Sequence, residues 1–219
     1  MFDWAKIDTV LLDMDGTLLD LHFDNHFWRE HLPLRYAQHH EISKKDAHNF
    51  LMAGYEDVAG TIDWYCLDYW AEKTKLPIVE LKKEVQHLIQ MRDDAHDFLV
   101  ALKKANKKVI LVTNAHPAAL QLKIERTGLD TYFDQLISTH QFGVTKESQL
   151  LWQRLQQHLQ FDISTTLFVD DSLPILQSAQ TFGIANLLAI ANPDSKLPSN
   201  DISEFISIEH YQEVIPDIC

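Results

Sequence analysis

The sequence predicts an α/β fold, a doubly wound parallel sheet that is interrupted after its first strand by an inserted helical cap. Short apolar runs alternate with helix-like segments through the second half of the chain, a pattern typical of parallel strands joined by crossover helices. Residues 20–91, in contrast, show helical patterning and few strand signals. A length of 219 residues accommodates one core domain with a smaller insertion. We therefore expect a core formed by residues 1–19 and 92–219 and a cap domain at residues 20–91.

The expected strands are short runs rich in aliphatic and β-branched residues, which favour extended structure. They lie near residues 9–13, 109–113, 135–138, 166–170 and 185–190. Several of these runs lead directly into polar residues. The carboxyl ends of the strands are therefore where we expect functional side chains.

Amphipathic segments between the expected strands predict the crossover helices. They cover residues 94–104, 118–127, 148–160 and 174–181. Gly128 and Gly183 follow two of them, at the position where a glycine commonly ends a helix. The alternation of these helices with strands predicts a parallel sheet.

The first expected strand ends in Asp13-Met14-Asp15-Gly16. Because side chains alternate along a strand, Asp13 and Asp15 point the same way, and their carboxylates repel each other unless a cation or a shared proton is present. One alternative is a solvated turn. Another is a weak calcium loop, but a loop of the EF-hand type needs further oxygen ligands at alternate positions and a later Glu, whereas Thr17, Leu19 and Leu21 follow here. The pattern favours a site for Mg²⁺ and phosphate.

Three more polar groups follow apolar runs further along the chain. Thr113 and Asn114 end the second strand, Lys146 follows the third, and Asp170 and Asp171 end the fourth. Each alone is weak evidence, because a Thr-Asn pair is commonly a turn and a lone lysine is commonly solvated. Ligands bind outside the carboxyl ends of parallel strands. The four groups in this order therefore indicate a single site.

This set of motifs resembles the haloacid dehalogenase (HAD) superfamily of phosphohydrolases. The similarity extends to residues 21–25, 63–70, 113–117, 127–130, 138–140 and 192–195, which are similar to HAD 5′-nucleotidases that act on GMP and IMP. The resemblance implies a HAD-like fold with a helical cap. It also implies a Mg²⁺-dependent phosphomonoester hydrolase that forms an aspartyl-phosphate intermediate.

The resemblance assigns a catalytic role to Asp13, Asp15 and Lys146. Asp13 would be the nucleophile, and Asp15 would protonate the leaving oxygen and then activate water. Thr113 and the backbone amide of Asn114 would bind phosphoryl oxygens, while Lys146 would neutralise charge around the nucleophile and the phosphate.

The same resemblance implies a Mg²⁺ site formed by Asp13, the backbone carbonyl of Asp15, and Asp170, with Asp171 as a possible further ligand. Ile175 stands where many relatives carry another aspartate, so the motif leaves open which carboxylate binds the metal directly.

Two other functions remain open at this point. One keeps the fold and the chemistry but acts on phosphoglycolate or sugar phosphates, as a phosphatase or phosphomutase. The other is a non-hydrolytic, receiver-like phosphoacceptor, although receiver domains lack a cap and need only about half this length. The aromatic residues of the cap segment could stack on a purine or could form the core of the cap: Tyr55, Trp64, Tyr65, Tyr69 and Trp70.

Composition narrows the possible partners. A net charge of −13 argues against binding to nucleic acid, and no run approaches the ~20 apolar residues that span a bilayer. The first residues lack the features of a secretory signal. Two cysteines, Cys66 and Cys219, predict neither a disulfide framework nor a zinc site. We expect a cytoplasmic enzyme whose partner is a small nucleoside monophosphate; the oligomeric state is not predicted.

Overall fold

The computed structural model describes residues 2–218, and its centre is a six-stranded sheet in the order β3-β2-β1-β4-β5-β6. Every neighbouring pair of strands is parallel. The strands are β1 (Thr9–Leu12), β2 (Lys108–Thr113), β3 (Gln135–Ser138), β4 (Thr166–Asp170), β5 (Asn186–Ile190) and β6 (Ile206–Ile208). The strand order reverses direction at β1, so the carboxyl end of β1 is the switch point where ligands of such sheets bind.

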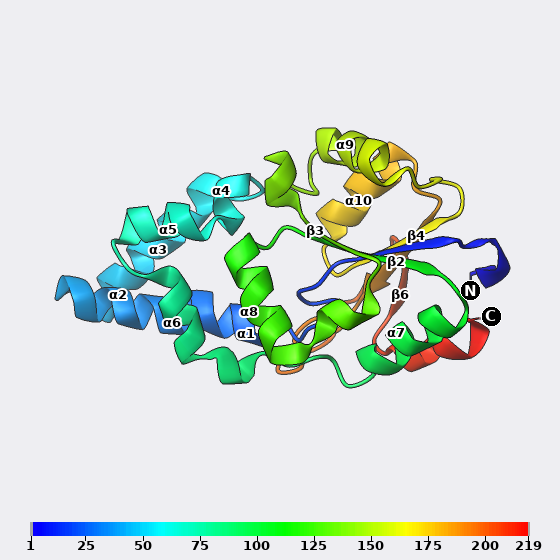
Figure 1. Ribbon diagram of the computed structural model, residues 1–219. Helices are drawn as coiled ribbons and strands as arrows, with labels where there is room; N and C mark the ends of the chain where they lie inside the picture. Colours follow the sequence, from blue (N-terminus) through cyan, green and yellow to red (C-terminus); the bar gives the residue numbers. More distant parts are fainter. Residues whose placement is uncertain (1, 219) are drawn as a thin grey trace.

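The two faces of the sheet are covered by different helices, as a doubly wound fold requires (Figure 1). The crossover helices are α7 (Ala95–Lys104), α8 (Pro117–Thr127), α9 (Gln149–Leu159) and α10 (Leu173–Phe182). Val10 and Leu12 pack in one apolar cluster with residues of α7 and α8, while Leu11 belongs to a second cluster with Trp152 of α9. The predicted α/β class is confirmed, and the predicted core strands and helices agree with the structure to within one residue at each end.

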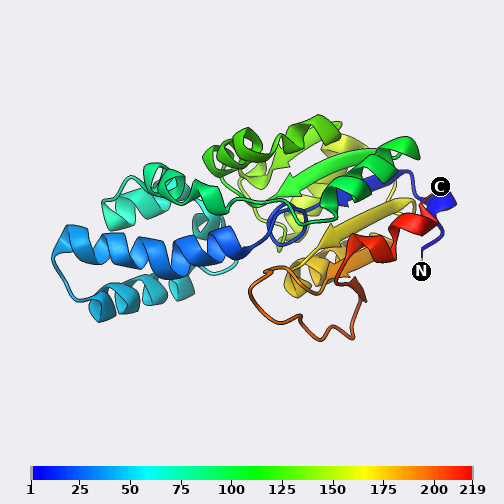
Figure 2. The same ribbon diagram turned by 90° about the horizontal axis from the view of Figure 1, so that it is seen from below.

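The segment between β1 and α7 contains helices and no strand. Figures 1 and 2 show these helices as a group at the end of the molecule opposite the two chain termini. They are α1 (His22–His26), the π-helical turn η2 (Phe27–His31), α2 (Leu32–His40), α3 (Lys44–Val58), α4 (Ile62–Tyr65), α5 (Leu67–Thr74) and α6 (Ile78–Glu84). We call them the helical group. The division into two domains at residues 19/20 and 91/92 stays a prediction.

A π-helical turn joins α1 to α2 without a break in the helix. Pro33 is the second residue of α2, just beyond this turn, and has no N–H to donate to the carbonyl of Arg29, four residues earlier. The irregular turn therefore lies where the regular hydrogen-bond ladder is interrupted.

The described residues also contain six short 3₁₀ helices. They are η1 (Trp4–Lys6), η3 (Gln86–Leu88), η4 (Leu129–Tyr132), η5 (Thr139–Phe142), η6 (Tyr211–Glu213) and η7 (Ile215–Asp217). Within residues 2–218, no helix is both long enough and apolar enough to cross a membrane. Cys66 is a free thiol, and Cys219 lies outside the described residues.

Candidate active site

The carboxyl end of β1 places Asp13 at the centre of the sheet edge. Its backbone N–H donates to the carbonyl of Val169 in β4 (3.0 Å), and its side chain is buried. The chain then turns at Gly16, which has a φ of +83°. A Cβ at Gly16 would overlap the Asp171 carboxylate. Only glycine allows this close approach, which brings the first acidic motif against the fourth.

Three carboxylates converge at this point. Asp13, Asp170 and Asp171 each offer an oxygen, and these atoms all lie within 4.8 Å of one another. Burial raises the pKa of Asp13 to about 6, and burial together with the neighbouring Asp170 and Asp13 raises the pKa of Asp171 well above its usual range. An all-oxygen set of two buried acids and one partly buried acid suits a hard divalent cation such as Mg²⁺.

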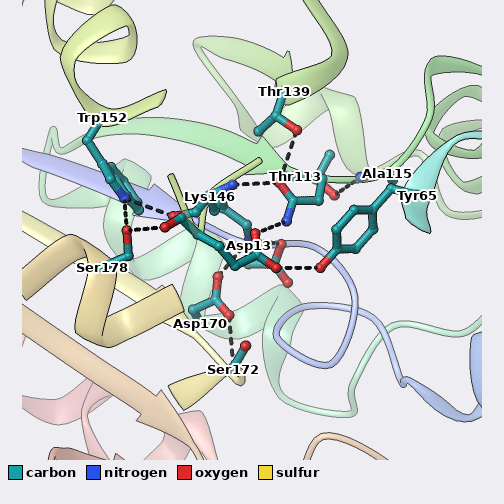
Figure 3. Close-up of polar contacts among 12 residues, drawn as sticks. Asp13, Tyr65, Thr113, Ala115, Thr139, Lys146, Trp152, Asp170, Ser172 and Ser178 are labelled. Atoms are coloured by element: carbon teal, nitrogen blue, oxygen red, sulfur yellow. Dashed lines mark hydrogen bonds and ion pairs between the residues drawn. The ribbon is translucent and has the colours of Figure 1, made fainter. Parts of the chain in front are cut away.

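Lys146 is the cation of this cluster. Its ammonium is buried and donates to a carboxylate oxygen of Asp13 and to Oδ2 of Asp170 (2.6 Å). Burial alone would lower the pKa of Lys146, but the two carboxylates raise it above its ordinary value, which favours the charged ammonium. The Lys146 carbonyl accepts from Nε1 of Trp152 (2.9 Å), which fixes the backbone beside it (Figure 3).

The Asn114 side chain holds two motifs together. Its Oδ1 accepts from the Thr139 hydroxyl (3.0 Å) and from the backbone N–H of Lys146 (3.0 Å), and its Nδ2 donates to Glu147 (3.1 Å). Thr113 Oγ1 accepts from the N–H of Ala115 (3.0 Å), which shapes the loop after β2 (Figure 3). The Asn114 side chain is therefore structural, and its backbone amide remains the group suited to bind an anion.

The structure adds two charged residues that the sequence did not single out, Lys123 of α8 and Lys82 of α6, and both pair with Asp24 of α1, which lies in the 21–25 segment of the resemblance. Lys123 Nζ lies 2.7 Å from Asp15 Oδ1 and 2.6 Å from Asp24 Oδ2, and Lys82 Nζ lies 2.8 Å from Asp24 Oδ1. The sequence held one signal for Lys123. It follows Ala119 and Leu120 at helical spacing, which places this lysine on the buried face of α8.

A single cavity of about 630 Å³ joins the sheet edge to the helical group. This volume is in the range of small-molecule sites. Its polar end is lined by Asp13, Asp15, Thr113, Asn114, Lys146, Asp170 and Asp171, and its helical end includes Trp28, Arg29, Met52, Tyr55, Trp64 and Tyr65. All the predicted site residues therefore face one cavity.

The aromatic residues of the helical group divide between cavity and core. Trp70 is fully buried and packs edge-on against Tyr55, with ring centroids 4.9 Å apart. Tyr55 and Trp64 pack against each other in the same way and also line the cavity. Trp28, which the sequence did not single out, lines the cavity too.

One group of possible metal donors was not predicted from the sequence. Cys66 lies beside His116 and His140, with one donor atom of each within 4.8 Å of the others. The cysteine count missed this group because histidines from distant loops complete it. His116 has a structural role in addition, since its Nδ1 accepts the N–H of Ala118 (3.2 Å) at the start of α8.

The raised pKa values of Asp13 and Asp15 predict that the stability of the protein depends on pH. A carboxyl whose pKa is raised by folding is harder to ionise in the folded than in the unfolded chain, so the free energy of unfolding falls as pH rises from ~4 through the folded pKa. Asp13 and Asp15, each with a pKa of about 6, place this loss between about pH 4 and pH 7.

We therefore expect Mg²⁺ to raise the melting temperature much more at about pH 7.5 than at about pH 5, because its ligands must be ionised. Thermal unfolding in EDTA and in Mg²⁺ at both pH values measures this difference. A Mg²⁺-induced shift of equal size at both pH values would contradict the assignment of the acidic site.

Comparison with known proteins gives consistent matches over the chain. Residues 7–183 match the family model described as haloacid dehalogenase-like hydrolase. The chain is 43% identical over 215 residues to the GMP/IMP nucleotidase YrfG of Escherichia coli (strain K12). This match covers 98% of this chain and 97% of that protein. A shorter match, 36% over 70 residues, covers 32% of the chain and 31% of the pyrimidine 5′-nucleotidase YjjG of the same organism. A HAD phosphatase from Thermococcus onnurineus has the same fold, with a TM-score of 0.77 at 22% identity over 95% of this chain and 96% of that one.

Proposed function

We propose that this chain, which belongs to the haloacid dehalogenase-like hydrolase family, is a Mg²⁺-dependent 5′-nucleotidase that acts on purine monophosphates, GMP and IMP foremost. One observation carries the proposal: the acidic cluster opens into the same cavity as the aromatic residues of the helical group. A phosphate at the acidic end would leave the nucleoside at the aromatic end. The overall similarity to a GMP/IMP nucleotidase supports this choice of substrate.

The residues present fit a magnesium site. Asp13, Asp170 and the backbone carbonyl of Asp15 would hold the ion, with Asp171 as a possible further ligand, and the convergence of the three carboxylates supports this set. Bound Mg²⁺ would supply positive charge that reduces repulsion between the Asp13 carboxylate and the phosphate dianion.

The proposed chemistry has two steps. A carboxylate oxygen of Asp13 attacks phosphorus while the ester P–O bond breaks, and Asp15 gives its proton to the departing ribose oxygen. Asp15 then takes a proton from water, which attacks the phosphorus of the aspartyl-phosphate and releases inorganic phosphate and free Asp13. Lys146, Thr113 and the amide of Asn114 hold the phosphoryl oxygens throughout, which positions the group for transfer.

The helical end of the cavity supports a purine over a smaller substrate. Trp28, Tyr55 and Trp64 line it, and stacking of a base on an aromatic side chain contributes ~1–3 kcal/mol. Phosphoglycolate would leave most of this volume unfilled. Membership of a hydrolase family removes the receiver-like alternative.

Phosphate release from a panel of phosphomonoesters tests the substrate. The panel contains GMP, IMP, AMP, pyrimidine monophosphates, phosphoglycolate and sugar phosphates, each assayed with Mg²⁺ and with EDTA. We expect Mg²⁺-dependent release with GMP and IMP preferred. Preference for sugar phosphates or phosphoglycolate would contradict the nucleotidase assignment but keep the chemistry.

The close approach at Gly16 gives a further prediction. Gly16→Ala adds a methyl group that overlaps the Asp171 carboxylate, so we expect activity to fall at least about tenfold and stability to fall by about 1–3 kcal/mol. Gly128→Ala is a matched control, because Gly128 also has a positive φ (64°) but no atom within 4 Å of the added Cβ. Phosphate release and urea unfolding of both variants measure the effects. Equal loss of activity in the two variants would show that backbone strain, not the contact with Asp171, matters.

A further inference from the structure

Four side chains of alternating charge lie in contact between the loop after β1 and the helical group. Lys123 Nζ forms an ion pair with Asp15 Oδ1 (2.7 Å) and donates to Asp24 Oδ2 (2.6 Å), and Lys82 donates to Asp24 Oδ1 (2.8 Å). We call Asp15, Lys123, Asp24 and Lys82 the four-charge chain. It connects three parts of the fold: the loop after β1, helix α8, which follows the loop after β2, and helices α1 and α6 of the helical group.

The two ammonium groups of this chain are shielded from solvent. Lys82 and Lys123 are each 2% exposed. Lys82 Nζ lies 4.4–5.1 Å from the ring centroids of Phe23, Phe27 and Trp28, and Lys123 Nζ lies 5.4 Å from that of Phe23. Both lysines line the cavity but are almost entirely covered by protein, so the loss of a partner carboxylate would leave a poorly compensated buried charge.

The ammonium of Lys123 is already paired with two carboxylates, and the ammonium of Lys82 is held by Asp24 and by aromatic faces. These contacts favour a structural task over direct binding of substrate. The group at the end of the chain is Asp15, which the proposed mechanism uses to protonate the leaving oxygen. Correct placement of a general acid is worth ~10²–10⁴-fold in rate.

We propose that Lys123 and Asp24 are positioning residues that hold the Asp15 carboxyl group toward the leaving oxygen, and that Lys82 makes this placement depend on the packing of α6 and α1 over the site. The helical group would then contribute to catalysis through Asp15, besides enclosing the substrate. This inference rests on the phosphoryl-transfer chemistry of the proposed function and not on the identity of the nucleotide.

A comparison of two leaving groups separates this role from a general loss of structure. p-Nitrophenolate departs without a proton, whereas the ribose alkoxide of a nucleotide requires one. The ratio kcat/KM covers the steps up to departure of the leaving group. A variant that misplaces Asp15 should therefore lose kcat/KM for an alkyl ester much more than for p-nitrophenyl phosphate.

The first variant is Lys123→Met. We expect kcat/KM to fall at least about 30-fold for IMP and less than about fivefold for p-nitrophenyl phosphate. The inhibition constant of IMP against p-nitrophenyl phosphate should change less than about threefold, because binding is retained. Lys123→Arg should restore part of the lost activity on IMP. If IMP is not a substrate, any alkyl phosphate that the native enzyme hydrolyses takes its place, so the test is independent of the nucleotidase assignment.

Asp24→Asn and Lys82→Met extend the test along the four-charge chain and decide it if Lys123→Met does not fold. Both should shift the ratio of the two substrates in the same direction, with the smaller shift for the more distant Lys82. Arg126→Met is the control, since Arg126 is an exposed residue of the same helix. Equal losses on both esters, or weaker IMP inhibition with an unchanged ratio, would overturn the positioning role. An unchanged ratio in Lys82→Met would overturn the link to the helical group.

Discussion

Replacing Asp13 by Asn is expected to reduce turnover at least about 10³-fold while leaving the fold intact. The amide that replaces the carboxylate cannot attack phosphorus, so the proposed covalent intermediate does not form. Asn also removes one of the three carboxylates that converge on the proposed metal site. Its similar size preserves the contacts around the end of β1. Steady-state phosphate release and circular dichroism measure the two parts of this prediction.

Asp201→Asn is a suitable control because it removes the same charge from an exposed residue outside the helices and strands. It should retain full activity. Activity of Asp13→Asn near that of the control would show that Asp13 is not the nucleophile.

Replacing Lys146 by Met should have the second large effect, and it should reduce both activity and stability. Lys146 pairs with Asp13 and Asp170 in a buried site, so its loss leaves carboxylates without a compensating charge. Removing one partner from a buried ion pair costs about 3–5 kcal/mol, and we expect a loss of this size in EDTA at neutral pH. Activity should fall by about 10²-fold or more because the phosphate loses a fixed positive charge.

Urea unfolding in EDTA and in Mg²⁺ measures the stability of this variant, and we expect Mg²⁺ to recover part of the loss. Lys104→Met serves as the control, since Lys104 is an exposed lysine of α7. A Lys146→Met protein as stable as the control in EDTA would show that Lys146 does not compensate the buried acids.

The core of the fold could be predicted from the sequence because its signals are local. Each crossover helix has its own apolar face, and the runs that form β1 to β5 are short and aliphatic. The strand β6 was missed because Ile206–Ile208 is too short to show a period, and it is defined by pairing with β5. The π-helical turn before Pro33 was missed for a related reason, since it depends on backbone geometry over two turns of helix.

The site was predictable where it follows from topology. Parallel strands bring their carboxyl ends to one edge, so Asp13, Thr113 and Asp170 meet there although they are far apart in the sequence. The pairing of Lys123 with Asp24 depends instead on how α8 packs beside the helical group, across 99 positions of sequence. Strand-end patterns carry no information about such contacts.

The most direct measurement of the central claim is the mass of the protein trapped during turnover. In Asp15→Asn, p-nitrophenyl phosphate can still transfer its phosphoryl group, because its leaving group needs no proton, while hydrolysis of the intermediate lacks its base. After an acid quench, mass spectrometry of the digest should show one phosphoryl group on the peptide that contains Asp13. Release of phosphate with no phosphorylated peptide, or a phosphoryl group on another residue, would contradict the account of this site.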